Sequence, residues 1–131
     1  MTMTIQEIFD AAIAGLASQN FERCFDDGCR YTIAREDGIV IHCAWGWVDQ
    51  SLPSAEVRDL TSLCRDRVGI AGTLGVEEMR FAARLQSTHD APEELMANPM
   101  KDRLLWLGRE YNLVIPSVLT DACNTPGEKA Y

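Results

Sequence analysis

The stretch CRYTIAREDGIVIHCAWGW, from Cys29 to Trp47, decides the fold of this chain. Two runs with alternating apolar residues, Arg30–Ala34 and Ile39–Trp45, flank a turn that contains Asp37-Gly38. An Asp-Gly pair between two such runs is typical of a β-hairpin. Because two strands alone are only marginally stable in water, this hairpin needs helices to cover it.

The second run is predicted to continue as one strand as far as Trp45. In such a strand Ile41, Cys43 and Trp45 point to one face, and His42 points to the other. Gly46 is then expected to end the strand. Since both faces are fairly apolar, we expect helices to cover at least one of them.

The rest of the chain has the apolar spacing of amphipathic helices. Thr4 to Glu7 is a capping-box motif and predicts a helix over residues 4–18. Ser54, directly after Pro53, is expected to cap a helix over residues 54–67. Further helices are predicted over residues 76–88 and 100–111, the latter ended by Asn112 in a left-handed conformation, with a short helical turn over 93–97.

These elements predict an α+β fold in which a two-stranded antiparallel β-hairpin packs against about four helices. We expect one globular domain over residues 1–119, because a chain of this length can bury its own core. Residues 120–131 include Asn124-Thr125-Pro126-Gly127 and are expected to form a flexible tail.

The composition excludes some classes of function. The 131 residues include 20 acidic side chains against 12 of Lys and Arg, a formal net charge of −8. Direct binding of nucleic acid through its phosphates needs a basic face, so we expect none. The acidity suits either simple solubility or docking onto a basic surface.

The N-terminus and the cysteines indicate a cytoplasmic protein. Met1-Thr2-Met3-Thr4 lacks the basic start of a signal peptide. No apolar run approaches the ~20 residues that span a bilayer, so we expect no contact with membranes. The five cysteines are an odd number without the spacing of a disulfide framework, which favours reduced thiols.

Cys43 and His89 are the candidates for a catalytic pair. A thiolate beside an imidazole that Asp90 or Asp49 orients would give a nucleophile and its base. Against this, a cysteine in the middle of a strand usually behaves as a small buried hydrophobe, and no helix N-terminus is expected after Cys43 to lower its pKa. His89-Asp90 is more simply explained as a cation at a helix end followed by a cap. We therefore favour a binding protein over an enzyme.

A metal site is not expected. Five potential donors are present, but no two cysteines have the Cys-x2-Cys spacing, and His42 and Cys43 are predicted to lie on opposite faces of a strand. The sequence therefore predicts neither a metal nor another cofactor. The five donors are Cys24, Cys29, His42, Cys43 and His89.

An acidic surface centred on a tryptophan is the best candidate for a binding site. Trp45 is expected in the core, whereas Trp47, beside Gly46 and a polar loop, is expected to be exposed. An acidic patch around an exposed aromatic would suit a basic partner, and an exposed Trp47 edge could also serve a homodimer. The predicted partner-binding residues are Glu36, Asp37, Trp47, Asp49, Glu56 and Asp59.

Several short motifs stand in a recurring order. They are Gln6–Asp10, Cys29-Arg30-Tyr31, Gly38 with Cys43-Ala44-Trp45-Gly46, Leu85–Asp90 with Pro92, and Glu110-Tyr111-Asn112-Leu113. In these short motifs the chain resembles a group of small, mostly uncharacterised proteins of tailed phages, prophages and plasmids, and the similarity covers most of residues 5–116. Trp47–Pro53 departs from the group, which usually has an acidic Pro-Asp-type segment there. The resemblance implies a phage-borne accessory protein and supplies no reaction.

Three hypotheses for function follow. The first is a non-enzymatic phage accessory protein in the host cytoplasm. It would bind and inhibit a host defence or nucleic-acid-handling protein with a basic surface, as anti-CRISPR and anti-restriction proteins do, by steric block or by mimicking DNA charge. The second is a small cysteine-dependent hydrolase that uses Cys43 and His89. The third is a protein that binds a small signalling molecule, such as a signal nucleotide, between the hairpin and the helices.

Overall fold

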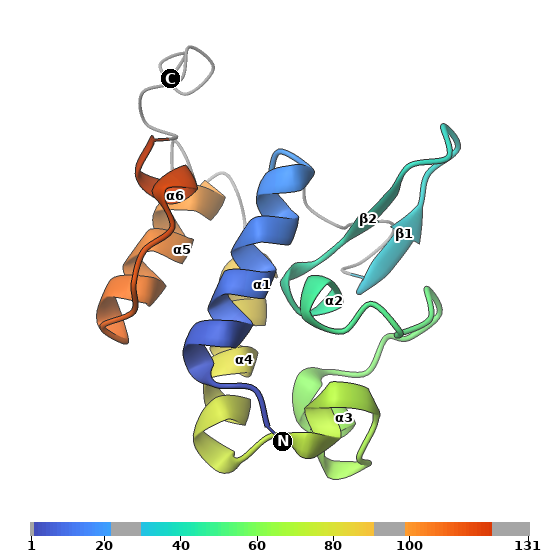
Figure 1. The fold of residues 1–131 in the computed structure, drawn as a ribbon. Helices are drawn as coiled ribbons and strands as arrows, with labels where there is room; N and C mark the ends of the chain where they lie inside the picture. Colours follow the sequence, from blue (N-terminus) through green and yellow to red (C-terminus); the bar gives the residue numbers. More distant parts are fainter. Residues whose placement is uncertain (1, 22–29, 91–98, 122–131) are drawn as a thin grey trace.

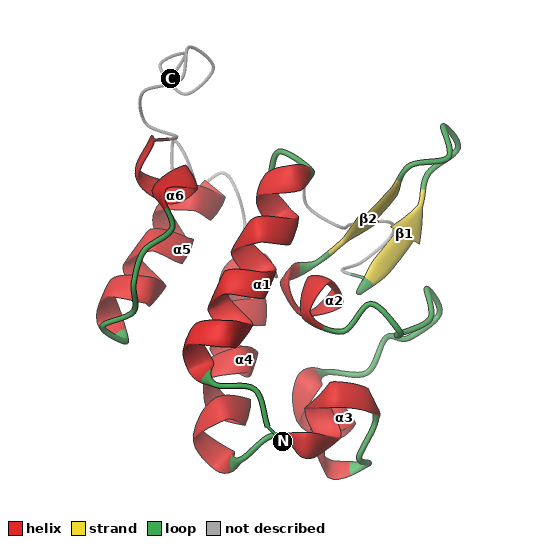
Figure 2. Cartoon of the chain, viewed as in Figure 1, coloured by secondary structure: helices red, strands yellow, loops and turns green. Residues whose placement is uncertain are grey.

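The computed structural model describes residues 2–21, 30–90 and 99–121, and it confirms the α+β fold (Figures 1 and 2). A two-stranded antiparallel sheet lies at one side of a group of helices, more of them than the four expected. The elements are α1 (Ile5–Ser18), β1 (Thr32–Ala34), β2 (Val40–His42), α2 (Ala44–Val48), α3 (Leu60–Arg65), the 3₁₀ helix η1 (Gly69–Thr73), α4 (Val76–Asp90), α5 (Pro99–Glu110) and α6 (Ser117–Asp121).

Helix α1 lies at the centre of the molecule. It packs against α2 and α4, and Figure 1 shows the hairpin on one side of it and the α5–α6 pair on the other. The predicted capping box is present: Thr4 Oγ1 accepts the Glu7 amide N–H at 3.1 Å, and Glu7 Oε1 accepts the Thr4 amide N–H at 2.8 Å. The fully buried stripe of α1 consists of Ile8, Phe9, Ala12, Ile13 and Leu16.

The predicted hairpin turn is confirmed. Arg35 closes the turn, because its carbonyl accepts the Gly38 amide and its own amide donates to the Ile39 carbonyl. Gly38 has φ +86°, a conformation that glycine adopts without strain. This is the three-residue hairpin connection in which a type I turn is followed by a left-handed residue. In the ladder Ile33 pairs with Ile41.

The prediction of one strand from Ile39 to Trp45 was wrong after His42. Cys43 is the N-cap of helix α2, so it does not lie within the strand. Its Sγ accepts the Gly46 amide, and Gln86 of α4 accepts the Trp45 amide at 3.0 Å. Two side chains thus satisfy amides at the start of the helix, which an isolated alternating pattern cannot reveal. Gly46 lies inside this helix and does not end a strand.

The prediction of a helix over residues 54–67 was wrong in its first part. Helix α3 begins at Leu60, and Asp59 caps it by accepting the Ser62 amide at 2.8 Å. Upstream, Tyr31 Oη donates to the Arg58 carbonyl at 2.8 Å. That carbonyl is therefore held by the hairpin, and Ser54 caps no helix. Val57, which lies in this non-helical stretch, is 65% exposed.

Three helices end in the same way. Asn20 after α1, Arg67 after α3 and Asn112 after α5 have φ values of 60°, 56° and 56°. At each end the following amide returns to the carbonyl five residues earlier, as in Leu113 to Gly108, which is the Schellman arrangement. The predicted left-handed Asn112 is confirmed.

The C-terminal half follows the predicted helices closely. Helices α4 and α5 occupy the predicted ranges to within two residues at each end. Helix α6 extends to Asp121, so the predicted tail from residue 120 begins inside a helix, while its remainder and the predicted turn over 93–97 lie outside the described residues. Within the described ranges, no helix is both long enough and apolar enough to cross a membrane.

Candidate functional site

Cys43 and His89, the predicted catalytic pair, are both enclosed in the protein. The Cys43 side chain is 0% exposed, and its sulfur accepts the N–H of the third residue of α2. The expectation that no helix N-terminus follows Cys43 was wrong. His89 lies in the last turn of α4 and is 1% exposed. Neither side chain presents an atom to a substrate in solution.

Asp49, one of the two carboxylates expected to orient the imidazole, instead accepts hydrogen bonds from Ile70 and Ser51. It is 3% exposed, and its Oδ2 accepts the Ile70 amide at 3.0 Å. Its Oδ1 accepts both the amide and the hydroxyl of Ser51. The carboxylate therefore fastens η1 to the end of α2. The prediction that Asp49 belongs to an exposed acidic patch was wrong.

His42 is a buried structural histidine. Its Nδ1 lies 3.0 Å from the Thr32 hydroxyl, and its ring packs edge-on against Trp47 with the centroids 4.6 Å apart. Burial lowers the pKa of the His42 imidazole. Among the described residues, no three His, Cys, Asp or Glu side chains gather so that they could hold a metal ion. Two of the predicted donors, Cys24 and Cys29, lie outside those residues.

Trp47 was expected to be an exposed binding aromatic, and the structure contradicts this. The indole packs over Gly15 of α1, where a Cβ would overlap its ring. Its Nε1 donates to Gln19 Oε1 at 2.9 Å. Gln19 also exchanges two hydrogen bonds with the backbone of His42, so Trp47 is part of the joint between α1 and β2.

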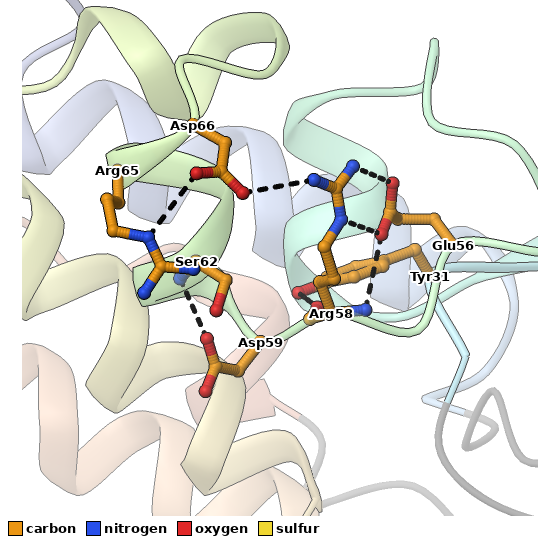
Figure 3. Close-up of polar contacts among 7 residues, drawn as sticks. All are labelled: Tyr31, Glu56, Arg58, Asp59, Ser62, Arg65 and Asp66. Carbon is orange, nitrogen blue, oxygen red and sulfur yellow. Dashed lines mark hydrogen bonds and ion pairs between the residues drawn. The ribbon is translucent and has the colours of Figure 1, made fainter.

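Glu56 is partly buried and Asp59 is exposed, and both carboxylates accept hydrogen bonds from neighbouring residues (Figure 3). The Arg58 guanidinium donates twice to the Glu56 carboxylate, at 2.8 Å each, and this lowers the pKa of Glu56 to about 2. The other end of Arg58 reaches Asp66 at 3.2 Å. Because Asp59 caps α3, the two acids do not form an unpaired acidic surface with Trp47 and Asp49.

A cleft does lie between the hairpin and the helices. It has a volume of about 390 Å³, and Tyr31, Arg58, Thr61, Gln86 and Ser87 contribute to its walls. Tyr31 and Gln86 already donate to or accept from backbone groups of neighbouring segments. The lining also contains Arg30 and Asp59, so the cleft offers hydroxyl groups, two guanidinium groups and one carboxylate to a ligand.

The hairpin tip is the part of the predicted binding surface that the structure keeps exposed. Glu36 and Asp37 are both exposed, and Figure 1 shows the tip projecting away from the helical body. Next to them, Ile39 is 55% and Val40 is 47% exposed. The tip thus combines two carboxylates with two large apolar side chains.

The exposed tryptophan of this protein is Trp106, which is not among the predicted partner-binding residues. It is 68% exposed on α5. The signal was available in the spacing: Met100, Leu104 and Leu107 form a buried stripe with helical spacing, and Trp106 lies outside it.

No protein-family model, curated protein or solved structure matches this chain. The geometry of the chain itself is therefore the basis for a functional assignment.

Proposed function

We propose that this chain is a non-enzymatic phage accessory protein that acts in the host cytoplasm. It binds and inhibits a host defence or nucleic-acid-handling protein, and the contact is made by the hairpin tip. The observation that carries this proposal is the exposure of two acidic and two apolar side chains, Glu36, Asp37, Ile39 and Val40, at the projecting hairpin tip.

The chemistry of the tip suits a partner with a basic pocket or channel. Apolar side chains at the centre of a contact supply most of the affinity, whereas the flanking carboxylates select a positive surface. The net charge of −8 steers the whole molecule toward such a surface. Asp37 is partly neutralised by Arg35 at 3.3 Å, so Glu36 is the stronger contributor to this selection.

Steric block is the mode that the charge distribution favours. Mimicry of DNA requires a regular array of unpaired negative charges along a surface. Glu56 is bound by Arg58, Asp59 caps a helix, and Asp49 is buried. The acids that could have extended such an array from the tip are thus occupied.

The test compares two charge reversals of equal size. Tagged wild-type protein, Glu36→Arg and Glu77→Arg are used to capture proteins from host lysate, followed by quantitative mass spectrometry. Glu77 is exposed at the start of α4 and serves as the matched control. We expect a host protein that the wild type and Glu77→Arg retain and Glu36→Arg loses by at least about tenfold. Equal retention by the wild type and both variants would reject the tip as the contact.

A second candidate function is the binding of a small molecule in the cleft beside Tyr31 and Arg58. Its volume of about 390 Å³ is of the size that small-ligand sites have. A thermal-shift screen of nucleotides with the wild type and Ser87→Trp checks this candidate. A ligand that raises the melting temperature of the wild type alone would support it.

A further inference from the structure

We infer that a second surface, the groove between α1 and residues 114–118, binds an amphipathic helix of a partner protein with lysine or arginine beside its apolar face. The groove has a volume of about 500 Å³, and its walls are formed by α1, the residues that lead into α6 and the first turn of α6. It is a different surface from the hairpin tip, so this inference does not depend on the proposed contact there.

The wall opposite α1 is fixed in place. Gln6 Nε2 donates to the Val114 carbonyl at 3.1 Å, and the Val114 amide donates to Gln6 Oε1 at 2.9 Å. Pro116 then restricts the backbone before α6 begins at Ser117. A groove with rigid walls binds a partner without the entropic cost of ordering them.

The groove exposes apolar side chains that the fold does not bury. Val114 is 77% exposed and Val118 is 36% exposed, while Ala14 is exposed on the α1 side. Single exposed apolar residues are common on protein surfaces. Here they are contiguous around one cavity, and contiguous apolar surface marks an interaction site.

The shape of the groove favours a helix as its occupant. Its α1 wall contains Asp10, Ala14 and Ala17, which follow one another at intervals of four and three residues. Such a row is ~10 Å long, which corresponds to two turns of a second helix. The two alanines are small enough to let another helix approach closely, as in helix-in-groove recognition.

The charge of the walls favours a basic occupant. Asp10 lines the groove and is exposed, and Glu7 lies one turn before it on α1. The sequence of α1 contains no Lys, Arg or His, and residues 112–120 carry no charged side chain. Because the charged side chains that α1 and residues 112–120 contribute are all negative, a partner helix gains from Lys or Arg beside these walls and loses from Glu.

The experiment uses synthetic peptides of 18 residues as probes. One has leucine at helical spacing with lysine elsewhere, a second replaces lysine by glutamate, and a third repeats the first with two central prolines. Binding to the full chain is measured by isothermal titration calorimetry. We expect the lysine peptide to bind at least about tenfold more tightly than either of the other two.

Two variants of the chain locate the binding. Ala14→Gln places a polar side chain in the groove without changing the net charge, and Ala55→Gln adds the same group at an exposed position outside it. We expect Ala14→Gln to weaken the lysine peptide about tenfold and Ala55→Gln to leave it unchanged. Circular dichroism confirms that both variants fold.

Three results would overturn the inference. Equal weakening by both variants, or none by Ala14→Gln, would place the peptide elsewhere. Tight binding of the proline peptide would indicate an extended occupant. A dimer seen by analytical ultracentrifugation that Ala14→Gln abolishes would assign the groove to a second copy of this chain. Failure of the hairpin-tip test affects none of these measurements.

Discussion

At the scale of single residues, Cys43 shows how one side chain can look catalytic and act structurally. Its sulfur stands where serine, threonine or aspartate usually cap a helix, and it accepts the Gly46 amide at 3.3 Å. The same side chain is fully buried and fills space in the core. A thiol meets both demands because it is a weak acceptor and otherwise behaves as a small hydrophobe.

The effect of replacing Cys43 on stability should therefore depend on whether the new side chain can cap the helix, and not on whether it is a nucleophile. Cys43→Ala removes the acceptor and some volume, and we expect it to lower the free energy of unfolding by about 1–2 kcal/mol. Cys43→Ser keeps an acceptor and should cost less than Cys43→Ala. Urea unfolding followed by circular dichroism measures both. If serine cost as much as alanine, the capping role would be wrong.

His42 makes stability depend on pH in a defined direction. Burial lowers the pKa of its imidazole in the folded protein below the ordinary value of 6.5. The contribution of His42 to the free energy of unfolding is fully present above pH 6.5, where the imidazole is neutral in both the folded and the unfolded state. As the pH falls from there toward the folded pKa, the unfolded chain takes up the proton first, and stability decreases.

The expected signature is a loss of unfolding free energy between pH 7.5 and 5.5 that is smaller in His42→Gln. Glutamine keeps a polar group beside the Thr32 hydroxyl without titrating in this range. Urea unfolding at three pH values provides the comparison. An identical slope in both proteins would show that another group controls the pH dependence.

At the scale of elements, two glutamines join α1 to segments far away in the sequence. Gln6 pairs with both the amide and the carbonyl of Val114, and Gln19 does the same with His42. A primary amide can imitate a strand residue in this way because it offers one donor and one acceptor side by side. Gln19 thereby covers part of the outer edge of β2, which would otherwise be open to pairing.

Gln19→Ala is expected to destabilise the chain by about 2 kcal/mol, because it leaves backbone groups of His42 and the Trp47 indole N–H without their acceptor or donor. Gln6→Ala is the matched variant on the same helix. It affects an exposed pair and should cost clearly less. Thermal unfolding of both variants gives the comparison, and equal losses would refute the special role of Gln19.

Arg67 ends α3 in a conformation that costs free energy for a residue with a Cβ. Its φ is +56°, whereas the other two Schellman endings use asparagine. Arg67→Gly should raise the unfolding free energy by about 1 kcal/mol. Arg65→Gly, inside the same helix, should lower it by a similar amount. The difference in melting temperature between the two variants is the readout, and a destabilised Arg67→Gly would contradict the prediction.

The sequence predicted those elements whose signals are local. The capping box at Thr4, the Asp37-Gly38 turn and the left-handed Asn112 each act within a few residues, and all three are confirmed. The two wrong predictions, a strand continuing past His42 and a helix beginning at residue 54, concern segments whose conformation depends on contacts with residues distant in the sequence. Gln86 holds the start of α2, and Tyr31 holds the Arg58 carbonyl ahead of α3. No window along the sequence contains both partners of these contacts.

At the scale of the whole molecule, the candidate site was predicted only in part. The exposed tip at Glu36 and Asp37 could be found, because a hairpin turn must face solvent. Trp47 was misplaced because Gly15, more than thirty positions earlier, leaves room for its ring. The groove at Val114 was missed altogether, since it exists only where α1 meets the segment before α6 and the start of α6.

The overall charge gives a prediction that tests the molecule as a unit. With 20 acidic residues against 12 of Lys and Arg, the folded state concentrates a net charge of −8 and repels itself. Ion pairs such as Arg35–Asp37, Arg58–Asp66 and Arg65–Asp66 oppose this, but they are exposed and worth little each. Salt weakens both the repulsion, which stabilises the fold, and the ion pairs, which destabilises it. The larger of the two effects therefore decides whether salt raises or lowers the melting temperature.

We expect repulsion to be the larger effect, so that raising sodium chloride from 20 to 300 mM increases the melting temperature by about 3 °C. Differential scanning calorimetry at pH 7.5, where His42 is neutral, isolates this effect from the histidine titration. Glu77→Lys removes two units of negative charge outside the ion pairs and should reduce the salt response. A melting temperature that falls with salt would mean that the arginine ion pairs around Arg58, and not the net charge, control the electrostatic stability of the fold.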